Sequence, residues 1–184
     1  MRLSRVSFFA DFYIYPTLAV ALVAIAFTVA PDQWLASCLA VLIGAMVWTL
    51  VEYLLHRFML HSVPWIKEQH AAHHNSHQDL IGTPTWLSLG LTLVAVLFPA
   101  ILITNLALGS GFTAGFMLGY LWYVAAHYAV HHRTAQTGSY FSRLQRRHAV
   151  HHHYDVMGNF GVSSGLWDYV FLTNVTVRGK SSRA

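Results

Sequence analysis

The chain has 184 residues, of which 55% are apolar and only 10% carry a charge. A soluble domain normally has about a quarter of its residues charged, so the composition indicates an integral membrane protein. The formal net charge of +4 comes without an aromatic and basic groove or a nucleic-acid-binding motif, and we expect no nucleic-acid partner. The single cysteine excludes a disulfide framework and a cysteine-based metal site, so nitrogen and oxygen atoms would hold any metal.

Four stretches are long and apolar enough to cross a bilayer as helices: Phe12 to Ala30, Trp34 to Leu55, Thr85 to Leu108, and Phe112 to His131. Only residues 31–33 separate the first two, and only Gly109, Ser110 and Gly111 separate the last two. These short links predict two tight helical hairpins, with a kink at Pro99. The predicted fold is therefore an all-α integral membrane four-helix bundle of two hairpins, in one domain over residues 1–184. The N-terminal run contains Asp11 and has no clean cleavage site, so we expect a retained span.

The positive charges predict how the bundle is oriented. All eleven Lys and Arg residues lie before the first predicted span, between the second and the third, or after the fourth. With four spans these three regions share one face, and the positive-inside rule makes that face cytoplasmic. Both termini are expected there, in the inner membrane of a bacterium or the endoplasmic reticulum of a eukaryote.

Histidine is confined to two parts of the chain. All thirteen histidines lie within residues 56–77 and 127–153. Each of these windows starts at the cytoplasmic end of a predicted span and continues into the following loop. Two segments that are far apart in sequence therefore bring their rings to the same face, and we predict a histidine-rich helical cap on the cytoplasmic side.

The spacing of the histidines predicts which rings point the same way. His127 and His131 are four residues apart, which is about one helical turn. His56 and His61 are five apart, which suits a helix end that unwinds or bends. Two triplets have the i, i+3, i+4 spacing of a single helical face: His70, His73 and His74, and His148, His151 and His152.

These ten histidines predict a dinuclear metal centre. One transition ion takes about four to six ligands, so ten rings suit two ions. Each ligand nitrogen would lie about 2.0–2.2 Å from its ion, by analogy with zinc. Carboxylates that could orient the rings are Glu52, Asp79, Asp155 and Asp168, each of which could instead pair with Arg57 or Arg147. His77, His132 and His153 fall outside the series, and we expect them to be structural.

Several other uses of clustered histidines fit less well. A pH sensor would not need two matching triplets. A metalloprotease of the common type would need His-Glu-x-x-His, which does not occur. A b-type haem would need axial histidines on facing helices within the bilayer. A membrane metal carrier would need ligands along the bilayer, and the middle of every predicted span lacks histidine. A non-catalytic metal-binding scaffold and a carrier nevertheless stay open as alternatives.

Five segments of the sequence resemble the fatty acid hydroxylase superfamily, which also contains sterol desaturases and carotenoid hydroxylases. They are HRFMLH (56–61), HAAHH (70–74), HYAVHH (127–132), HAVHHH (148–153) and NFGVSSGLWDYVFLT (159–173), within a resemblance covering residues 48–173. The resemblance implies an integral membrane enzyme with a histidine-rich, functionally di-iron centre that uses O2 to hydroxylate or desaturate a lipid. The implied ligands are His56, His61, His70, His73, His74, His127, His131, His148, His151 and His152. Zinc could replace the two iron ions in a purified sample.

Within the superfamily, the resemblance favours hydroxylation of a lipid acyl chain. The spacing of His56 and His61, the HYAVHH segment and the NFG and LWD segments near the end resemble fatty acid 2-hydroxylases. However, only eight residues separate His61 from His70, and this short link resembles sterol desaturases instead. A sterol or lipid desaturase and a carotenoid hydroxylase are therefore the alternatives.

The sequence also suggests where the lipid and an electron donor would bind. Trp48, Tyr53, Trp122 and Tyr123 are candidates to line an acyl-chain channel, although such residues are more often bundle core or interfacial belt. Gly115 and Gly119 are predicted helix-packing positions. The chain shows no flavin, nicotinamide or haem-binding fingerprint, so electrons would come from an external ferredoxin or cytochrome b5-type donor. Arg143, Arg146 and Arg147 could bind such an acidic partner or could only enforce topology.

Overall fold

The computed structural model describes residues 1–76, 78–154 and 157–177, and this part of the chain contains helices and irregular segments but no strand. The bundle consists of α1 (Arg5–Phe9), α2 (Asp11–Val29), α3 (Trp34–Leu54), α5 (Thr85–Thr92), α6 (Phe98–Ile103) and α7 (Leu106–His132). A 3-10 turn, η1 (Pro31–Gln33), and two π-helical turns, η2 (Leu55–Leu60) and η3 (Leu93–Leu97), connect or interrupt these helices. Three further helices are α4 (Pro64–Asn75), α8 (Tyr140–His153) and α9 (Leu166–Val170).

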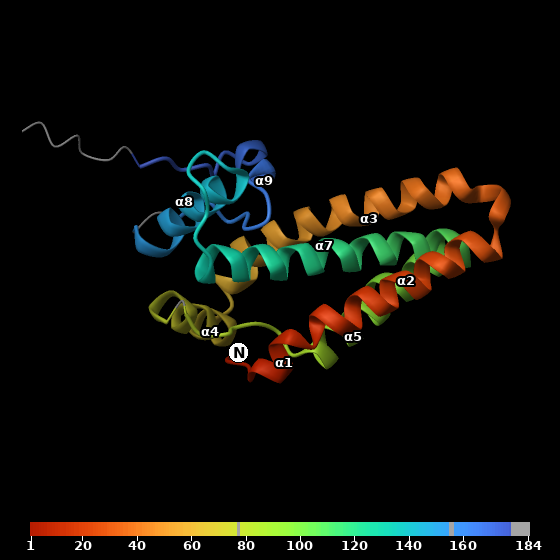
Figure 1. Cartoon of the computed structure of the whole chain (residues 1–184), viewed down its shortest axis with the longest axis horizontal. Helices are drawn as coiled ribbons and strands as arrows, with labels where there is room; N and C mark the ends of the chain where they lie inside the picture. The colour runs from red at the N-terminus through yellow and green to blue at the C-terminus, as the bar shows by residue number, and fades with distance from the viewer. Residues whose placement is uncertain (77, 155–156, 178–184) are drawn as a thin grey trace, which may run out of the picture.

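The short helices α4, α8 and α9 gather at one end of the bundle (Figure 1). The tight turn between α2 and α3 lies at the opposite end, while α3 and α7 run side by side along the length of the molecule. The histidine-bearing segments therefore form a helical cap at one end, as the sequence predicted.

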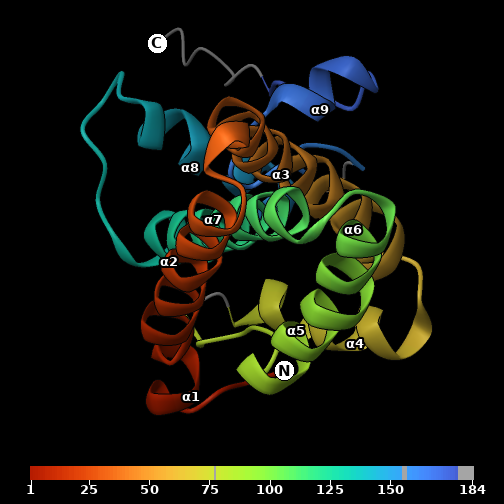
Figure 2. The same cartoon turned by 90° about the vertical axis from the view of Figure 1, so that its right-hand side faces the viewer.

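Three helical segments of the described residues are long and apolar enough to cross a membrane: Arg5–Val29, Pro31–Leu60 and Thr85–Ile103. Most of their residues face outward, which suits contact with lipid. The helix α7, although 27 residues long, is not among them. It lies at the centre of the bundle, among α2, α3 and α6 (Figure 2). Its sequence is rich in small residues, which lower its hydropathy but allow close packing.

Glycines allow α3 and α7 to approach closely. A Cβ atom added to Gly44 would lie 1.9 Å from the carbonyl oxygen of Phe112, and one added to Gly115 would lie 1.9 Å from that of Val41. A Cβ atom on Gly119 would lie 2.6 Å from the Cβ atom of Trp48. The predicted helix-packing positions are thus confirmed, because no larger residue fits at this backbone separation.

The turn before α7 differs from the prediction. The chain turns at Thr104 and Asn105, so the third span ends at Ile103 and not at Leu108. Asn105 ends the turn because its side chain accepts a hydrogen bond from the backbone N–H of Leu108 at 2.9 Å. The predicted break at residues 109–111 is wrong, since these residues are buried within α7.

The interruption predicted at Pro99 takes the form of the π-helical turn η3. Proline lacks a backbone N–H, and its ring clashes with the carbonyl group four residues earlier. That residue is Ala95, which lies within η3. The widened turn accommodates the proline, and α6 begins immediately after η3 with Pro99 in its first turn.

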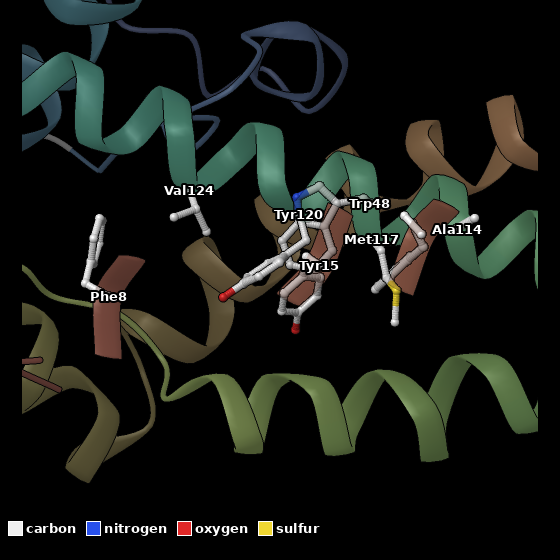
Figure 3. Close-up of a cluster of buried hydrophobic side chains, with 9 residues drawn as sticks. Phe8, Tyr15, Trp48, Ala114, Met117, Tyr120 and Val124 are labelled. Carbon is white, nitrogen blue, oxygen red and sulfur yellow. The ribbon is translucent and has the colours of Figure 1, made fainter. Parts of the chain in front are cut away.

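Aromatic side chains from α1, α2, α3 and α7 contribute to the core of the bundle (Figure 3). The ring of Tyr120 lies 4.5 Å from that of Tyr15 and 5.1 Å from that of Trp48, measured between centroids. Trp48 also packs edge-on against Phe116 at 5.0 Å. These contacts fix α2, α3 and α7 relative to one another. Trp48 is therefore a core residue and not a channel wall.

Candidate metal centre

The π-helical turn η2 brings His56 and His61 to the same side of the chain. A π-helical turn has i→i+5 hydrogen bonds, so residues five apart are nearly aligned. The two rings stack with centroids 5.2 Å apart and planes inclined by 22°. The five-residue spacing therefore predicted a bent helix end correctly.

The other histidines lie on three helices, as the spacing predicted. His70, His73 and His74 share one face of α4, while His127 and His131 lie in the last two turns of α7. Ser139 caps the N-terminus of α8, because its hydroxyl accepts a hydrogen bond from the backbone N–H of Ser142. Its buried face carries His148 and His151, with His152 beside them.

Nine of the ten rings form two groups. Each ring offers one nitrogen atom as a possible ligand, and within a group these atoms all lie within 4.8 Å of one another. The first group contains His73, His127, His131, His148 and His152, and the second contains His56, His61, His70 and His151. The helices α4 and α8 contribute to both groups, which holds the groups side by side. His74 lies between them, since its Nε2 atom is 3.0 Å from that of His70 and its ring stacks on His152 at 4.1 Å.

Two of the remaining three histidines lie beside the groups without joining them. The ring of His132 stacks on Tyr128 at 4.5 Å. The ring of His153 lies 6.1 Å from that of His152. His77 is outside the described residues.

The hydrogen bonds of two rings show that their inner nitrogens fit a metal ion. The Nδ1 atoms of His56 and His151 lie 2.5 Å and 2.9 Å from the carbonyl oxygens of Phe160 and Gly158. A carbonyl oxygen only accepts, so each Nδ1 carries the proton and each Nε2 of the neutral ring has a lone pair. Those Nε2 atoms face other histidine Nε2 atoms, at 3.1 Å for His56 and His70 and 3.2 Å for His61 and His151.

A shared cation explains this close approach of ring nitrogens. Two ligand nitrogens about 2.1 Å from one ion and at right angles to each other are about 3.0 Å apart. The Nε2 atoms of His73 and His127 are also 3.0 Å apart, and those of His131 and His148 are 2.8 Å apart. Both ring nitrogens of His152 are buried without a hydrogen-bond partner among the described residues. The donor set therefore fits metal ions in both groups.

The electrostatics of the cap keep several of its ligand-type rings neutral. Burial, with a smaller contribution from neighbouring imidazoles, lowers the pKa of His61, His74 and His151 to about 4. The same causes hold the pKa of His148 well below its ordinary range. Neutral imidazole is the form that binds metals, so these rings can act as ligands at neutral pH.

Asp168 holds the segment whose carbonyl groups orient the rings. Its carboxylate is fully buried and accepts hydrogen bonds from the backbone N–H groups of Phe160 and Gly161 at 2.8 and 2.9 Å. It also pairs with the guanidinium group of Arg147 at 2.9 Å. The sequence left two roles open for this carboxylate, and the structure shows the pairing with Arg147 and no hydrogen bond to a ligand ring among the described residues. Asp168 instead acts through the backbone that it anchors.

Glu52 anchors the same segment from the side of α3. Its Oε1 atom accepts hydrogen bonds from the backbone N–H groups of Val162 and Ser163 at 2.7 and 2.8 Å, and Ser163 also donates its hydroxyl to Oε2. Glu52 therefore does not contact a ligand ring either. Asp79 pairs with Arg2 at the surface, 2.9 Å away, and Asp155 lies outside the described residues.

A largely apolar cavity of about 350 Å³ reaches the histidines from within the bundle. Four of the ten rings, His56, His70, His73 and His127, form part of its wall. Of the four predicted channel residues, only Tyr123 lines it. Tyr53 instead packs beneath the C-terminal segment, where its hydroxyl lies 3.0 Å from that of Thr173. Trp122 is 43% exposed and packs against Phe141.

The predicted basic docking surface is smaller than expected. The guanidinium group of Arg147 makes its contacts within the protein: it pairs with Asp168, donates a hydrogen bond to Asn174 and lies over the ring of Tyr169. Its inclusion in a docking surface is therefore wrong. Arg143 and Arg146 are exposed on α8 and remain available.

Comparisons with known proteins all indicate one enzyme family. A family model described as fatty acid hydroxylase matches residues 41–173. The chain is 34% identical to human fatty acid 2-hydroxylase over 145 residues, covering 72% of this chain and 38% of that protein. It is 33% identical to the ceramide very long chain fatty acid hydroxylase of Saccharomyces cerevisiae, covering 74% of this chain and 38% of that one. The chain thus spans less than half the length of these relatives.

A solved structure has the same fold. The structure of full-length scs7p, in which only the hydroxylase domain is visible, superposes with a TM-score of 0.77 at 25% sequence identity. The match covers 92% of this chain and 67% of that one. The similarity therefore includes both the helical bundle and the histidine-bearing cap.

Proposed function

Because the chain belongs to the fatty acid hydroxylase family, we propose that it hydroxylates the acyl chain of a membrane lipid, using O2 at a di-iron centre held by the ten histidines. The substrate would be a fatty acid or an acyl-lipid, as the names of the human and yeast relatives suggest. The observation that carries the proposal is the apolar cavity, one wall of which consists of four histidine rings. An acyl chain in this cavity would bring a C–H bond to the histidine centre.

The two histidine groups would hold the two ions. The group of five would hold one, the group of four the other, and His74 lies where it could complete the second set. When bound, two iron ions would supply the redox chemistry that reduces O2 and replaces one C–H bond by C–OH. The balance requires two electrons and two protons and releases one water molecule. A purified sample could contain zinc, because an all-imidazole site binds zinc more tightly than ferrous iron.

The protein's own residues would place the substrate and limit access of water. The apolar wall of the cavity would hold the acyl chain, and Tyr123 would lie beside it near the rings. Phe160 and Gly158 would keep the protons of His56 and His151 on Nδ1, leaving Nε2 free for metal. The water-excluding wall would protect the oxidising centre from side reactions.

The electrons would come from outside the chain. An external ferredoxin or cytochrome b5-type donor with an acidic surface would bind near Arg143 and Arg146, which are exposed on the helix that carries four of the histidines. We propose that α7, which runs alongside α3, also crosses the bilayer, so that the cap and both termini face the cytoplasm, and that residues 1–184 form one domain.

Lipid mass spectrometry on cells that express the protein tests this function. Wild-type cells should contain a lipid heavier by one oxygen atom, and a double variant with His151→Ala and His152→Ala should lack it. His153→Ala is the matched control, because His153 lies on the same helix outside both groups. A loss of two hydrogens in place of the added oxygen would indicate a desaturase. The absence of any difference, with the proteins present in the membrane and a donor supplied, would indicate a metal-binding scaffold.

A further inference from the structure

A buried carboxylate lies in the wall of the apolar cavity. Asp11, in the first turn of α2, is 4% exposed, and its Oδ2 atom accepts a hydrogen bond from the hydroxyl of Tyr120 at 2.6 Å. Its Oδ1 atom is buried and has no hydrogen-bond partner among the described residues. The two ion pairs of that part of the chain join Arg2 to Asp79 and Arg147 to Asp168, so neither involves Asp11.

A purely structural role explains the burial of only one of the two carboxylate oxygens of Asp11. The bond from Tyr120 ties α7 to α2, and the ring of Tyr120 is already held by Tyr15 and Trp48 (Figure 3). One acceptor atom would suffice for that bond. A second, unpartnered carboxylate oxygen within a membrane-spanning segment is unfavourable unless something donates to it. Such residues in membrane proteins usually serve a ligand or a pathway.

The position of Asp11 suggests which ligand group would donate. Asp11 and Tyr120 line the same cavity as His56, His70 and His127. A lipid in this cavity would have its acyl chain against the apolar wall, and a polar group next to that chain would lie within the same space. An amide N–H or a hydroxyl could donate to Oδ1, whereas the carboxylate of a free fatty acid would repel it.

We propose that Asp11 is a positioning residue that accepts a hydrogen bond from an N–H or O–H group adjoining the acyl chain, so that the site prefers a neutral acyl amide or hydroxylated acyl-lipid to a free fatty acid. This inference rests on the proposed function only for the choice of a lipid as the occupant. By holding the polar group, Asp11 would set how far along the cavity the chain extends and thus which carbon faces the histidines. Tyr120 would hold the carboxylate in place.

Binding of three matched probes to the purified full-length protein tests this proposal. N-methylpalmitamide and methyl palmitate have the same acyl chain and differ in one N–H group, and palmitate carries a negative charge. The apparent Kd of each probe is measured by thermal-shift titration in detergent, without an electron donor. The variants are Asp11→Leu, which removes both oxygens, and Asp11→Asn, which keeps one acceptor and removes the charge. The control is Leu87→Ala, which alters the cavity wall without changing a polar group.

The wild type should bind the amide about tenfold more tightly than the ester, because only the amide can donate a hydrogen bond to the carboxylate of Asp11. Asp11→Leu should bring the two Kd values together, and Asp11→Asn should tighten binding of palmitate. Leu87→Ala should weaken amide and ester binding by the same factor. Equal wild-type binding of amide and ester, or a preference for the amide that persists in Asp11→Leu, would overturn the proposal. Metal content of each variant reports whether the cap has folded.

The assay separates this proposal from the proposed function. Binding of the probes requires neither oxygen nor electrons, so a preference for the amide without any hydroxylated product would support the role of Asp11 and contradict the hydroxylase. Hydroxylation of a lipid by a protein that does not distinguish amide from ester would support the hydroxylase and contradict the role of Asp11.

Discussion

The Nδ1 atom of His56 donates a hydrogen bond to the carbonyl oxygen of Phe160 at 2.5 Å, across 104 positions of sequence. This contact joins the end of a bundle helix to the C-terminal segment of the cap. It sets the tautomer of the ring and directs Nε2 toward the other histidines. The stability of the segment around Phe160 should therefore control metal affinity.

Replacing Asp168 by Asn should weaken metal binding, because it removes the charge that holds Phe160, Gly161 and Arg147 together. Residues that orient metal ligands typically contribute about 10- to 100-fold to affinity, and we expect a loss at the lower end of that range. The metal affinity of each variant is measured by competition with a chelator. Asp79→Asn is the control, since Asp79 pairs with Arg2 at the surface. Equal affinities of the two variants would show that the segment does not position the rings.

Acid should destabilise the metal-free protein over a defined range. The pKa values of His61, His74 and His151 are lowered to about 4 in the folded state, whereas in the unfolded chain a histidine titrates near its ordinary value of about 6.5. Between these values the unfolded state binds protons that the folded state does not, so unfolding becomes more favourable as pH falls. The Tm of the metal-free protein should drop as pH falls from about 6.5, and it should go on dropping below about pH 4 because the pKa of His148 is lowered further still. A Tm that does not change across this range would contradict the neutral, buried state of the rings.

Two identical substitutions should have opposite effects on stability. Gly115→Ala adds a Cβ atom that would lie 1.9 Å from the carbonyl oxygen of Val41, so α3 and α7 must separate. Overpacking of this kind typically destabilises by about 1–3 kcal/mol. Gly90→Ala, in the helix α5, meets nothing within 4 Å and should be neutral or stabilising by up to about 1 kcal/mol. Thermal unfolding in detergent compares them, and similar Tm values for the two variants would rule out close contact of α3 and α7.

The helices and the grouping of the histidines follow from sequence periodicity, but the partners of the rings do not. The i, i+3, i+4 spacing on α4 and α8 predicts a common face because side chains repeat with the helical turn. Backbone carbonyl groups orient His56 and His151, and any residue type can supply such a group. The turn before α7 was misplaced because glycine suits both a turn and a close helix contact, and residues 109–111 serve the second purpose. Likewise Trp48 and Tyr123 look equivalent in sequence, and only packing separates core from cavity wall.

Electron transfer should depend on the exposed arginines of α8. The double variant Arg143→Glu and Arg146→Glu should slow turnover with an external acidic donor, and the defect should be larger at low salt because screening weakens charge attraction. Lys67→Glu, an exposed charge reversal on α4, is the comparison. A double variant whose salt dependence matches the wild type would place the donor elsewhere.

The incorporation of labelled oxygen tests the central claim most directly. The purified protein, loaded with iron and supplied with lipid and a reduced donor under oxygen-18 gas, should yield an acyl chain that carries one oxygen-18 atom. The variant with His151→Ala and His152→Ala should yield none. An unlabelled product, or a labelled product formed equally by that variant, would contradict hydroxylation at the histidine centre.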